Sequence, residues 1–349
     1  MKWFRKHKIL TAFVLILLLL LLLIGTVVGF IWSKLRLIQY DDGTLKEVYS
    51  ESQSAGPEET EPAEEAGPGV DISGLEEMET FPVIPEAEIQ EKDDVVNILV
   101  LGTDERTTDL SENARSDSMI LVSIDKTNKT VKLVSLERGM GVYMETGMMA
   151  GEYDLLTHAF RWGGANLVCD CVETNLRVEV DHYVRVNFTT VRTVVDAIGG
   201  IDMELTEAEA NVMGQYVPGL KTGMNHLDGD AALRFARLRS IDSDWQRVER
   251  QRKVILAAVD ALKGASLKEL NNLLDQTLPL IQTDMSMLDI AEMMLYAPNF
   301  LTSEFDQMTI PKQGTYGYKS GIKGFAVDYE VNSQILRDFL YGVEGEASE

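Results

Sequence analysis

Cysteine is almost absent from the sequence. Only Cys169 and Cys171 occur among the 349 residues. If they lie on a helix, their side chains point to different faces, so a disulfide between them is geometrically poor. No second pair of cysteines or histidines stands at metal-ligand spacing, which argues against a zinc site. We expect buried free thiols and a fold that depends on its apolar core.

Histidine is nearly as scarce, and no nucleotide-binding motif is present. The four histidines are His7, His158, His182 and His226. None stands in a recognisable setting with a serine or cysteine nucleophile, which argues against a Ser-His-Asp hydrolase. The sequence also lacks a phosphate-binding loop and a dinucleotide fingerprint. His158, within LLTHAF, is expected to be a packed structural histidine.

Basic residues are few relative to acidic ones. Lysine and arginine total 32 against 56 aspartates and glutamates, a formal net charge of −24. Sequence-independent binding of nucleic acid needs a wide basic surface, so the composition argues against it. The acidic excess lies mainly in residues 41–94, which hold 18 acidic residues and two lysines. Apolar residues make up 45% of the chain, enough for a sizeable core.

One long apolar run stands near the N-terminus. Residues 9–31 carry no charge and are long enough to span a bilayer with some tilt. Four basic residues precede the run, so the positive-inside rule places residues 1–8 in the cytoplasm and the rest of the chain outside the cell. A cleaved signal peptide is the alternative, but its apolar region would be about 7–15 residues long. We predict a single-pass transmembrane anchor over residues 9–32, with Trp32 at the membrane interface.

A spacer is expected between this anchor and the folded domain. Residues 33–94 are rich in glutamate and proline and poor in aromatic residues. Such a segment buries too little apolar surface to offset the entropy lost on ordering, and its charge extends it. We predict an acidic disordered linker over residues 33–94, an extracellular folded domain over residues 95–341 and a C-terminal tail over residues 342–349.

Within the folded domain, apolar runs and alternating segments predict strands, and apolar positions three and four apart predict helices. Strands are expected over residues 95–102, 118–125, 130–136, 182–187, 201–205 and 305–310. Helices are expected over residues 164–177, 189–198, 227–237, 246–263, 271–281, 287–295 and 331–341. The mixed order, with one tight hairpin, predicts an α/β fold in which helices pack on both faces of a mixed central sheet.

Charged side chains fall where three of these strands end. Asp104 and Asp117 flank the loop between the first two strands, and Arg138 follows the third. Sheet proteins commonly place binding groups at such positions. Two aspartates at adjacent strand ends can share Mg²⁺, which keeps waters that a phosphate can replace. Alternatively, both are turn or cap residues, or they pair with Arg106 and Arg115.

A basic cluster stands out against the acidic background. Residues 234–253, RFARLRSIDSDWQRVERQRK, hold six arginines and one lysine against three acidic residues. The rigid fork of arginine suits phosphate oxygens, so the cluster predicts a site for a compact polyanion. The alternative is a solvated face with local ion pairs, which would account for Arg234, Arg252 and Lys253. Asp244 is a candidate N-cap for the helix that follows it.

Spacing picks out the residues of this cluster that suit a common ligand. Arg237 and Arg239 share one face if they lie on an extended segment after a helix. On the next helix Arg247 and Gln251 are four residues apart, and Arg250 is three from Arg247. Side chains at these spacings stack on one helical face.

Seven motifs run through the domain in order. They are NILVLGTDER (97–106), RSDSMILVSID (115–125), SLERG (135–139), THAFRWGG (157–164), VDAIGGIDMEL (195–205), LDGDAALRFARLR (227–239) and DWQRVERQ (244–251). In these motifs and their spacing, over residues 95–341, the chain resembles the LytR-CpsA-Psr family of bacterial envelope enzymes. The resemblance implies a Mg²⁺-dependent transferase that moves an anionic glycopolymer, such as teichoic acid or capsule, from a polyprenyl-pyrophosphate carrier in an apolar groove to peptidoglycan, forming a phosphodiester. The implied partners are that lipid-linked donor, the peptidoglycan acceptor and the cell membrane.

The resemblance also implies roles for individual residues. Asp104 and Asp117 would hold Mg²⁺ and, with Arg138 and Arg247, form the catalytic set. The pyrophosphate would be held by Arg138, Arg237, Arg239, Arg247 and Gln251. Supporting residues would be Arg106 and Arg115, which order the metal loop, and Asp244 and Arg250.

Two positions depart from the family pattern. Glu137-Arg138-Gly139 stands where the family usually has Pro-Arg-Asp, and Leu155 stands where it usually has lysine. The second change removes a cation expected near the pyrophosphate, for which Arg161 is one substitute. Two alternatives therefore stay open: a polyprenyl-pyrophosphate phosphatase that uses water as acceptor, and a non-catalytic lipid-binding regulator of the envelope. The general base also stays open, an aspartate of the metal pair being one option.

Overall fold

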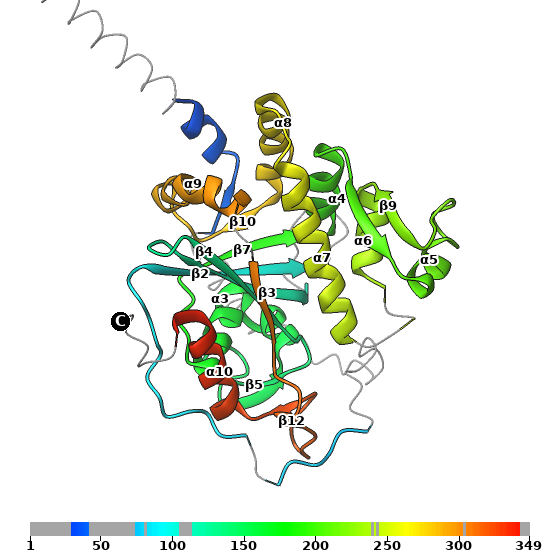
Figure 1. The fold of residues 1–349 in the computed structure, drawn as a ribbon. Helices are drawn as coiled ribbons and strands as arrows, with labels where there is room; N and C mark the ends of the chain where they lie inside the picture. The colour runs from blue at the N-terminus through cyan, green and yellow to red at the C-terminus, as the bar shows by residue number, and fades with distance from the viewer. Residues whose placement is uncertain are drawn as a thin grey trace, which may run out of the picture.

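A twisted central sheet runs through the molecule (Figure 1). The computed structural model describes residues 29–41, 74–79, 82–104, 114–238, 241, 244–302 and 305–342. The sheet has the strand order β1-β10-β7-β2-β3-β4-β11. Its strands are β1 (Gln39–Tyr40), β2 (Val95–Thr103), β3 (Ser116–Asp125), β4 (Thr130–Leu136), β7 (His182–Asn187), β10 (Gln282–Thr283) and β11 (Phe305–Ile310).

Strand directions confirm the predicted mixed sheet. β3 pairs antiparallel with β2 on one side and with β4 on the other. β7 pairs in parallel with β2, and β11 pairs in parallel with β4. The strands predicted over residues 130–136, 182–187, 201–205 and 305–310 are confirmed to the residue. The predicted strands 95–102 and 118–125 are also present, but β2 continues to Thr103 and β3 starts at Ser116. Both strands therefore extend toward the loop that joins them.

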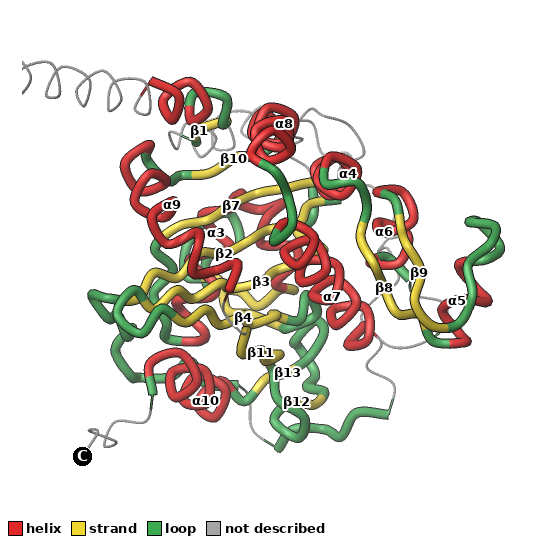
Figure 2. Tube along the Cα trace, turned by 45° about the horizontal axis from the view of Figure 1, so that its top comes forward, coloured by secondary structure: helices red, strands yellow, loops and turns green. Residues whose placement is uncertain are grey.

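Helices cover both faces of the sheet, as predicted (Figure 2). They are α3 (Leu156–Leu176), α4 (Phe188–Ala197), α5 (Glu207–Met213), α6 (Gly229–Ala236), α7 (Asp244–Leu262), α8 (Leu267–Thr277), α9 (Met287–Thr302) and α10 (Tyr329–Tyr341), with the 3₁₀ turn η1 (Leu278–Leu280). Leu99 of β2 belongs to the core that α3 and α10 cover, whereas Ile98 packs with Ile290 of α9. Leu133 of β4 belongs to a cluster with Leu256 of α7. Because neighbouring strand residues point to opposite faces, both faces of the sheet are buried.

Every predicted helix is present, but several boundaries differ. α3 starts at Leu156 rather than at residue 164, because the chain is helical on both sides of a break at Gly163 and Gly164. α6 starts at Gly229, where the Asp228 side chain accepts a hydrogen bond from a backbone N–H of the first turn. The last residues of the predicted helix 271–281 form η1 instead. Besides β1 and β10, short elements that the sequence does not predict are α5, β5 (Gly141–Met144), β6 (Glu152–Leu155), β9 (Gly223–Leu227), β12 (Tyr316–Gly317) and β13 (Ala326–Val327).

A second, smaller core lies beside the sheet. β8 (Ile201–Leu205) and β9 form a hairpin that packs with α5 and α6. Its buried residues include Met203, Phe235 and Val254, the last of which comes from α7. α7 thus lies between this smaller core and the central sheet, close to the ends of β2 and β3 (Figure 1).

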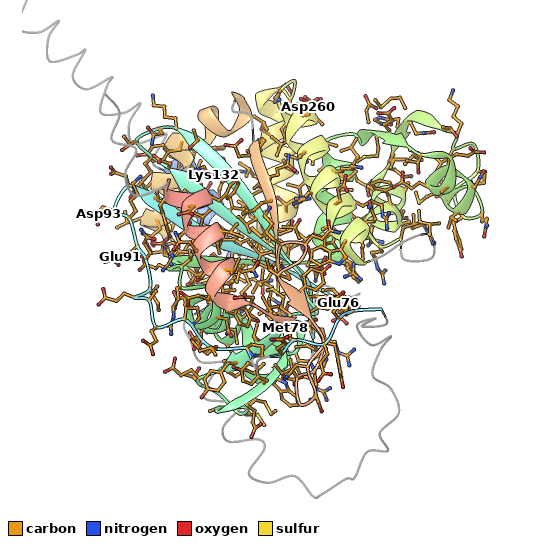
Figure 3. All side chains as sticks on the ribbon, turned by 60° about the horizontal axis from the view of Figure 1, so that its bottom comes forward. Glu76, Met78, Glu91, Asp93, Lys132 and Asp260 are labelled. Carbon is orange, nitrogen blue, oxygen red and sulfur yellow. The ribbon has the colours of Figure 1, made fainter. Side chains whose placement is uncertain are left out.

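The predicted disordered linker, residues 33–94, is wrong for the part of it that the structure describes. Residues 29–35 are helical, and β1 then pairs in parallel with β10 at the sheet edge. Farther along, Met78 donates a backbone hydrogen bond of 2.8 Å to Tyr318, and Tyr318 donates one of 2.8 Å to Glu76. Glu76 and Met78 lie against the outside of the domain (Figure 3). Composition missed these contacts because edge pairing uses backbone groups, which any residue except proline can supply.

The predicted N-terminal anchor falls almost entirely outside the described residues. Only residues 29–32 of the predicted anchor 9–32 are included. Within the described ranges, no helix is both long and apolar enough to cross a bilayer. The cysteines are free thiols, as predicted: Cys171 is buried and Cys169 is partly buried. Burial raises the pKa of both thiols.

Candidate active site

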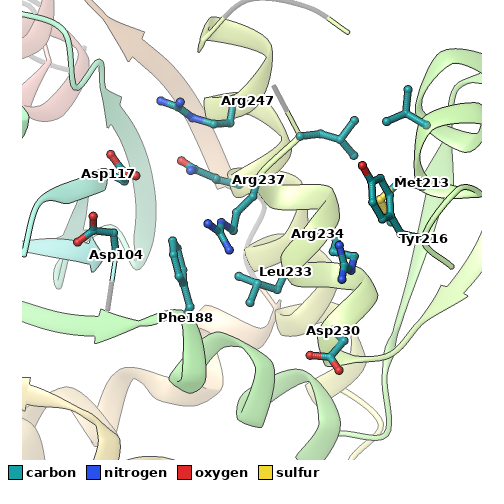
Figure 4. Close-up of a pocket in the computed structure, with 13 residues that line it drawn as sticks. Asp104, Asp117, Phe188, Met213, Tyr216, Asp230, Leu233, Arg234, Arg237 and Arg247 are labelled. Atoms are coloured by element: carbon teal, nitrogen blue, oxygen red, sulfur yellow. The ribbon is translucent and has the colours of Figure 1, made fainter. Parts of the chain in front are cut away.

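A pocket of about 670 Å³ opens where the ends of β2 and β3 meet α6 and α7. Acidic side chains from the sheet face basic side chains from the helices across it (Figure 4). The lining residues are Asp104, Asp117, Phe188, Val212, Met213, Tyr216, Asp230, Leu233, Arg234, Arg237, Leu238, Arg247 and Gln251. Five of the residues predicted for the site are therefore brought to one pocket: Asp104, Asp117, Arg237, Arg247 and Gln251.

The two aspartates are held by the ends of adjacent strands. Asp104 Oδ1 accepts a hydrogen bond of 3.0 Å from the backbone N–H of Arg115, and the Asp104 N–H donates one of 3.2 Å to the Arg115 carbonyl. This reciprocal pair fixes Asp104, the residue after β2, against Arg115, the residue before β3, and so holds Asp104 next to Asp117. Arg115 supports the aspartate as predicted, but through its backbone. Arg106 lies outside the described residues.

Arg138 contacts an aspartate that lines the pocket. Its Nη1 donates a hydrogen bond of 3.1 Å to Asp117 Oδ1, and the two side chains are only 11% and 20% exposed. Arg138 itself does not line the pocket. A charge-assisted bond in this partly buried setting orients the carboxylate and neutralises part of its charge.

The helices supply the opposite wall. Arg247 on α7 is 2% exposed, and Gln251 lies one turn later on the same helix. Arg237 ends α6, and its guanidinium lies 4.1 Å from the ring centroid of Phe188, a cation–π contact. Arg239, the remaining member of the predicted phosphate set, lies outside the described residues.

Two arginines of the basic cluster have structural roles. Arg250, 2% exposed, donates a hydrogen bond of 2.7 Å to the Leu238 carbonyl and lies 3.6 Å from buried Glu209. Through these contacts it supports the wall of the pocket. Arg252 was predicted to lie on the surface, but it is partly buried and donates to the Met308 carbonyl and to Thr309. Burial lowers the pKa of Arg252.

The remaining residues of the basic cluster differ in exposure and in whether they line the pocket. Lys253 is exposed and pairs with Glu249 at 3.1 Å, as predicted for a solvated face. Arg234 is exposed but lines the pocket, with its guanidinium 5.0 Å from the Tyr216 ring. α7 begins at Asp244 itself, two residues earlier than predicted, so Asp244 is the first helical residue rather than the residue before the helix.

The two departures from the family pattern lie side by side. A Cβ added to Gly324 would clash with both the Gly139 carbonyl and the Leu155 side chain. Arg161, the candidate substitute for the missing lysine, is exposed beside the Trp162 ring and does not line the pocket. The segment around Gly324 therefore packs onto both changed positions.

His158 has the structural role predicted for it. Its Nδ1 lies 3.1 Å from Oδ1 of the fully buried Asp154. Burial opposes ionisation of this carboxyl, but hydrogen bonds involving His158, the Leu155 N–H and the Trp162 indole N–H outweigh it and lower the pKa of Asp154. Lys323 adds a cation 3.2 Å away.

The donor set of the pocket suits a hard divalent cation. Asp104 and Asp117 both present carboxylate oxygens to it. Among the residues that the structure describes, no group of three or more His, Cys, Asp or Glu could hold a metal ion. Two protein ligands are enough for Mg²⁺, because this ion keeps several waters and is commonly bound by one or two carboxylates plus substrate phosphates.

The sequence missed the apolar half of the pocket. Phe188, Val212, Met213, Leu233 and Leu238 line it. In the sequence each has the pattern of an ordinary core residue. A periodic apolar pattern is the same for a side chain that packs against other side chains and for one that lines a pocket. The sequence offered a signal only for Leu233 and Leu238, which stand beside Arg234 and Arg237.

Known proteins are similar to this chain in sequence and in fold. The model of the LytR_cpsA_psr family matches residues 55–338. A Bacillus mycoides protein named polyisoprenyl-teichoic acid–peptidoglycan teichoic acid transferase TagU is 36% identical over 183 residues, covering 52% of this chain and 56% of the relative. An Enterococcus faecalis protein of the same name is 32% identical over 248 residues, covering 69% and 78%. The chain thus spans about half the length of the Bacillus relative.

Solved structures agree with these matches. The structure described as TagT bound to LI-WTA superposes with a TM-score of 0.58 at 27% identity, covering 75% of this chain and 97% of that one. A crystal structure of Bacillus subtilis TagT gives a TM-score of 0.56 at 25% identity, with the same coverage. Because the family model spans well over half of the residues, the chain belongs to the LytR-CpsA-Psr family.

Proposed function

We propose that this protein transfers an anionic glycopolymer from a polyprenyl-pyrophosphate carrier to peptidoglycan through a phosphodiester. The observation that carries the proposal is the single pocket in which Asp104 and Asp117 face Arg237, Arg247 and Gln251. The relatives named as teichoic acid transferases point to the same reaction.

The pocket residues divide between a metal and a pyrophosphate. Asp104 and Asp117 would hold Mg²⁺, which when bound neutralises charge on the transferred phosphate. Arg138 would orient Asp117, and Arg237, Arg247 and Gln251 would bind the pyrophosphate oxygens. Arg239 is proposed for the same set on the family motif. Buried guanidinium groups are effective here because charge interactions strengthen where water is excluded.

The apolar half of the pocket suits the carrier lipid. Phe188 and Leu233 stand next to the arginines, so an isoprenoid chain could lie against them while its pyrophosphate meets the charged half. We place the protein at the cell membrane, anchored by residues 9–32, with residues 1–8 in the cytoplasm and the domain outside. The support is the uncharged run and the basic residues before it.

The reaction breaks a phosphoanhydride bond and forms a phosphate ester bond. A peptidoglycan hydroxyl attacks the sugar-side phosphorus of the donor, and the bond from that phosphorus to the bridging oxygen breaks. The products are a sugar phosphodiester on peptidoglycan, a polyprenyl monophosphate and one released proton. The arginines stabilise the charge that develops on the leaving phosphate, which is the main requirement of phosphoryl transfer.

The test is a ligation assay with the full chain in lipid nanodiscs. The donor is a polyprenyl-pyrophosphate glycan, and the acceptor is a peptidoglycan oligomer, with and without Mg²⁺. We expect a ligated product that requires Mg²⁺ and is lost in Arg247→Ala. Release of sugar phosphate without ligation would instead indicate a phosphatase, and donor binding without any turnover would indicate a lipid-binding regulator.

A further inference from the structure

A second cavity lies beside the candidate active site. It measures about 430 Å³ and is lined by Trp245, Thr309, Pro311, Lys312, Gln313 and Tyr316. None of these residues lines the first pocket. Its lining combines large aromatic surfaces with a lysine, an amide and a hydroxyl, which are groups that bind polar ligands through specific hydrogen bonds.

Two aromatic rings, Trp245 and Tyr316, line this cavity, and a third, Phe325, packs against both of them. The Trp245 ring stacks on Tyr316 at 5.2 Å between centroids and on Phe325 at 6.2 Å. Tyr316 and Phe325 lie 5.3 Å apart. Rings on opposite faces of the indole would be separated by twice a contact distance, roughly 7 Å or more. Both therefore lie on the same side of Trp245, and two rings of this cluster, Trp245 and Tyr316, line the cavity.

This aromatic cluster is joined to the loop that carries Arg138. The Phe325 N–H donates a hydrogen bond of 2.8 Å to the Gly139 carbonyl, and the Gly141 N–H donates one of 2.9 Å to the Phe325 carbonyl. The cluster is therefore fixed relative to Arg138 by backbone bonds.

Helix α7 links the cavity to the phosphate side of the pocket. Trp245 and Arg247 are two residues apart on α7, which places their side chains about 200° apart around the helix axis. The helix therefore presents an aromatic ring to one cavity and a guanidinium to the other. The lining residues agree with this division, since Trp245 lines only the second cavity and Arg247 only the first.

We propose that the second cavity is a saccharide subsite that takes a neutral hexosamine ring of the acceptor glycan. A pyranose ring has an apolar C–H face that packs on an aromatic ring, and hydroxyl and amide groups at its edge that need hydrogen-bond partners. Trp245 supplies the first, and Lys312, Gln313 and Thr309 can supply the second. A lipid chain would make no use of these polar groups.

The location matches an acceptor strand rather than the lipid donor. The cavity lies on the side of α7 away from Arg247, so the bound ring is not the reacting one but lies further along the strand. This assignment to the acceptor rests on the proposed function. The existence of a saccharide site does not, because it can be measured without donor lipid.

The test uses the full chain in nanodiscs with 5-fluorotryptophan at its four tryptophans. The Trp245→Phe variant assigns the Trp245 fluorine signal by its loss. Titration with N-acetylglucosamine tetramer should move that signal selectively, with saturation below about 10 mM, as expected for a Kd near 1 mM. The affinities of the variants are measured by calorimetry with the same saccharide.

The variants separate ring contact from folding. Trp245→Ala should weaken binding at least tenfold, whereas Trp245→Phe should stay within about threefold because a ring remains, a difference of at least about 0.7 kcal/mol. Lys312→Ala, at the partly exposed edge, should weaken binding severalfold even if Trp245→Ala fails to fold. An unmoved Trp245 signal, or affinity unchanged in both Trp245→Ala and Lys312→Ala, would overturn the proposal.

A second arm identifies the source of the sugar. A soluble anionic glycopolymer fragment replaces the tetramer; if it alone moves the Trp245 signal, the acceptor assignment is wrong. In the ligation assay, Lys312→Ala should raise KM for peptidoglycan and leave kcat nearly unchanged. Saccharide binding without any ligation would contradict the proposed function alone, and an unchanged KM would contradict the acceptor subsite alone.

Discussion

Arg138 donates a hydrogen bond of 3.1 Å from Nη1 to Oδ1 of Asp117, joining the end of β4 to the start of β3. The neighbouring Asp104 is held differently, by the backbone N–H of Arg115. Within the described part of the chain, the two aspartates are thus held differently: a guanidinium contacts Asp117, and a backbone N–H contacts Asp104. We infer that Arg138 sets the orientation of Asp117, whereas the strand ends set that of Asp104.

Loss of either carboxylate should abolish transfer without unfolding the protein. We expect Asp104→Asn and Asp117→Asn each to lower the ligation rate by at least about 100-fold, since each removes charge stabilisation at the reacting phosphate. The ligation assay and a thermal melt are the measurements. Asp202→Asn is the matched control, because Asp202 is exposed and pairs with His226 away from the pocket. Equal activity of all three variants would refute the metal assignment.

Arg250 should matter for stability. Arg250→Ala leaves the buried Glu209 carboxylate without its guanidinium, which costs about 3–5 kcal/mol in the free energy of unfolding. Lys253→Ala, three residues later on the same helix, removes an exposed pair and should cost less than about 1 kcal/mol. Urea denaturation measures both. A small cost for Arg250→Ala would mean that the pair with Glu209 does not hold the pocket wall.

Asp154 should make the fold sensitive to acid. Its folded-state pKa lies below the usual value of about 3.9, so ionised Asp154 stabilises the fold at neutral pH. That contribution is complete above the unfolded-state pKa and is lost as the pH falls from about 4 toward the folded-state pKa. In Asp154→Asn, the free energy of unfolding should be lower at pH 6 and should fall less steeply below pH 4. Asp260→Asn, at an exposed position, should follow the wild-type curve.

Gly324 should tolerate no side chain. Its φ of +74° and its contacts with Gly139 and Leu155 both oppose a Cβ. Gly314 has a similar φ of +84° but open space around it, so Gly314→Ala carries the backbone strain alone. We expect Gly324→Ala to cost at least about 1–3 kcal/mol more than Gly314→Ala in urea denaturation, the usual range for overpacking. Equal costs would show that the segment does not pack tightly on the two changed positions.

The sequence predicted the central sheet well, because its strands are long and apolar. Residues 130–136 pair with a strand on each side, and residues 305–310 pair with β4 along their whole length at the sheet edge. β1 and β10 have two residues each, and their pairing depends on backbone groups at the sheet edge. Such elements leave no periodic signal.

The charged half of the site was also predictable, whereas the other half was not. Asp104 and Asp117 stand at strand ends, and Arg247 and Gln251 stand one helical turn apart, so spacing alone brings each pair together. The roles of Arg250 and Arg252 were not predictable in the same way. Both have the spacing of ligand or surface residues, but Glu209 and the Met308 carbonyl, which are distant in sequence, bind them.

The central claim is that one pocket passes the sugar-side phosphate of the donor to peptidoglycan. The most direct measurement labels that phosphorus with ³²P and follows it through the ligation reaction with the full chain in nanodiscs. We predict that the label appears in the peptidoglycan fraction, with one unlabelled polyprenyl monophosphate formed per transfer. Label recovered as free sugar phosphate, or retained on the lipid, would contradict the account.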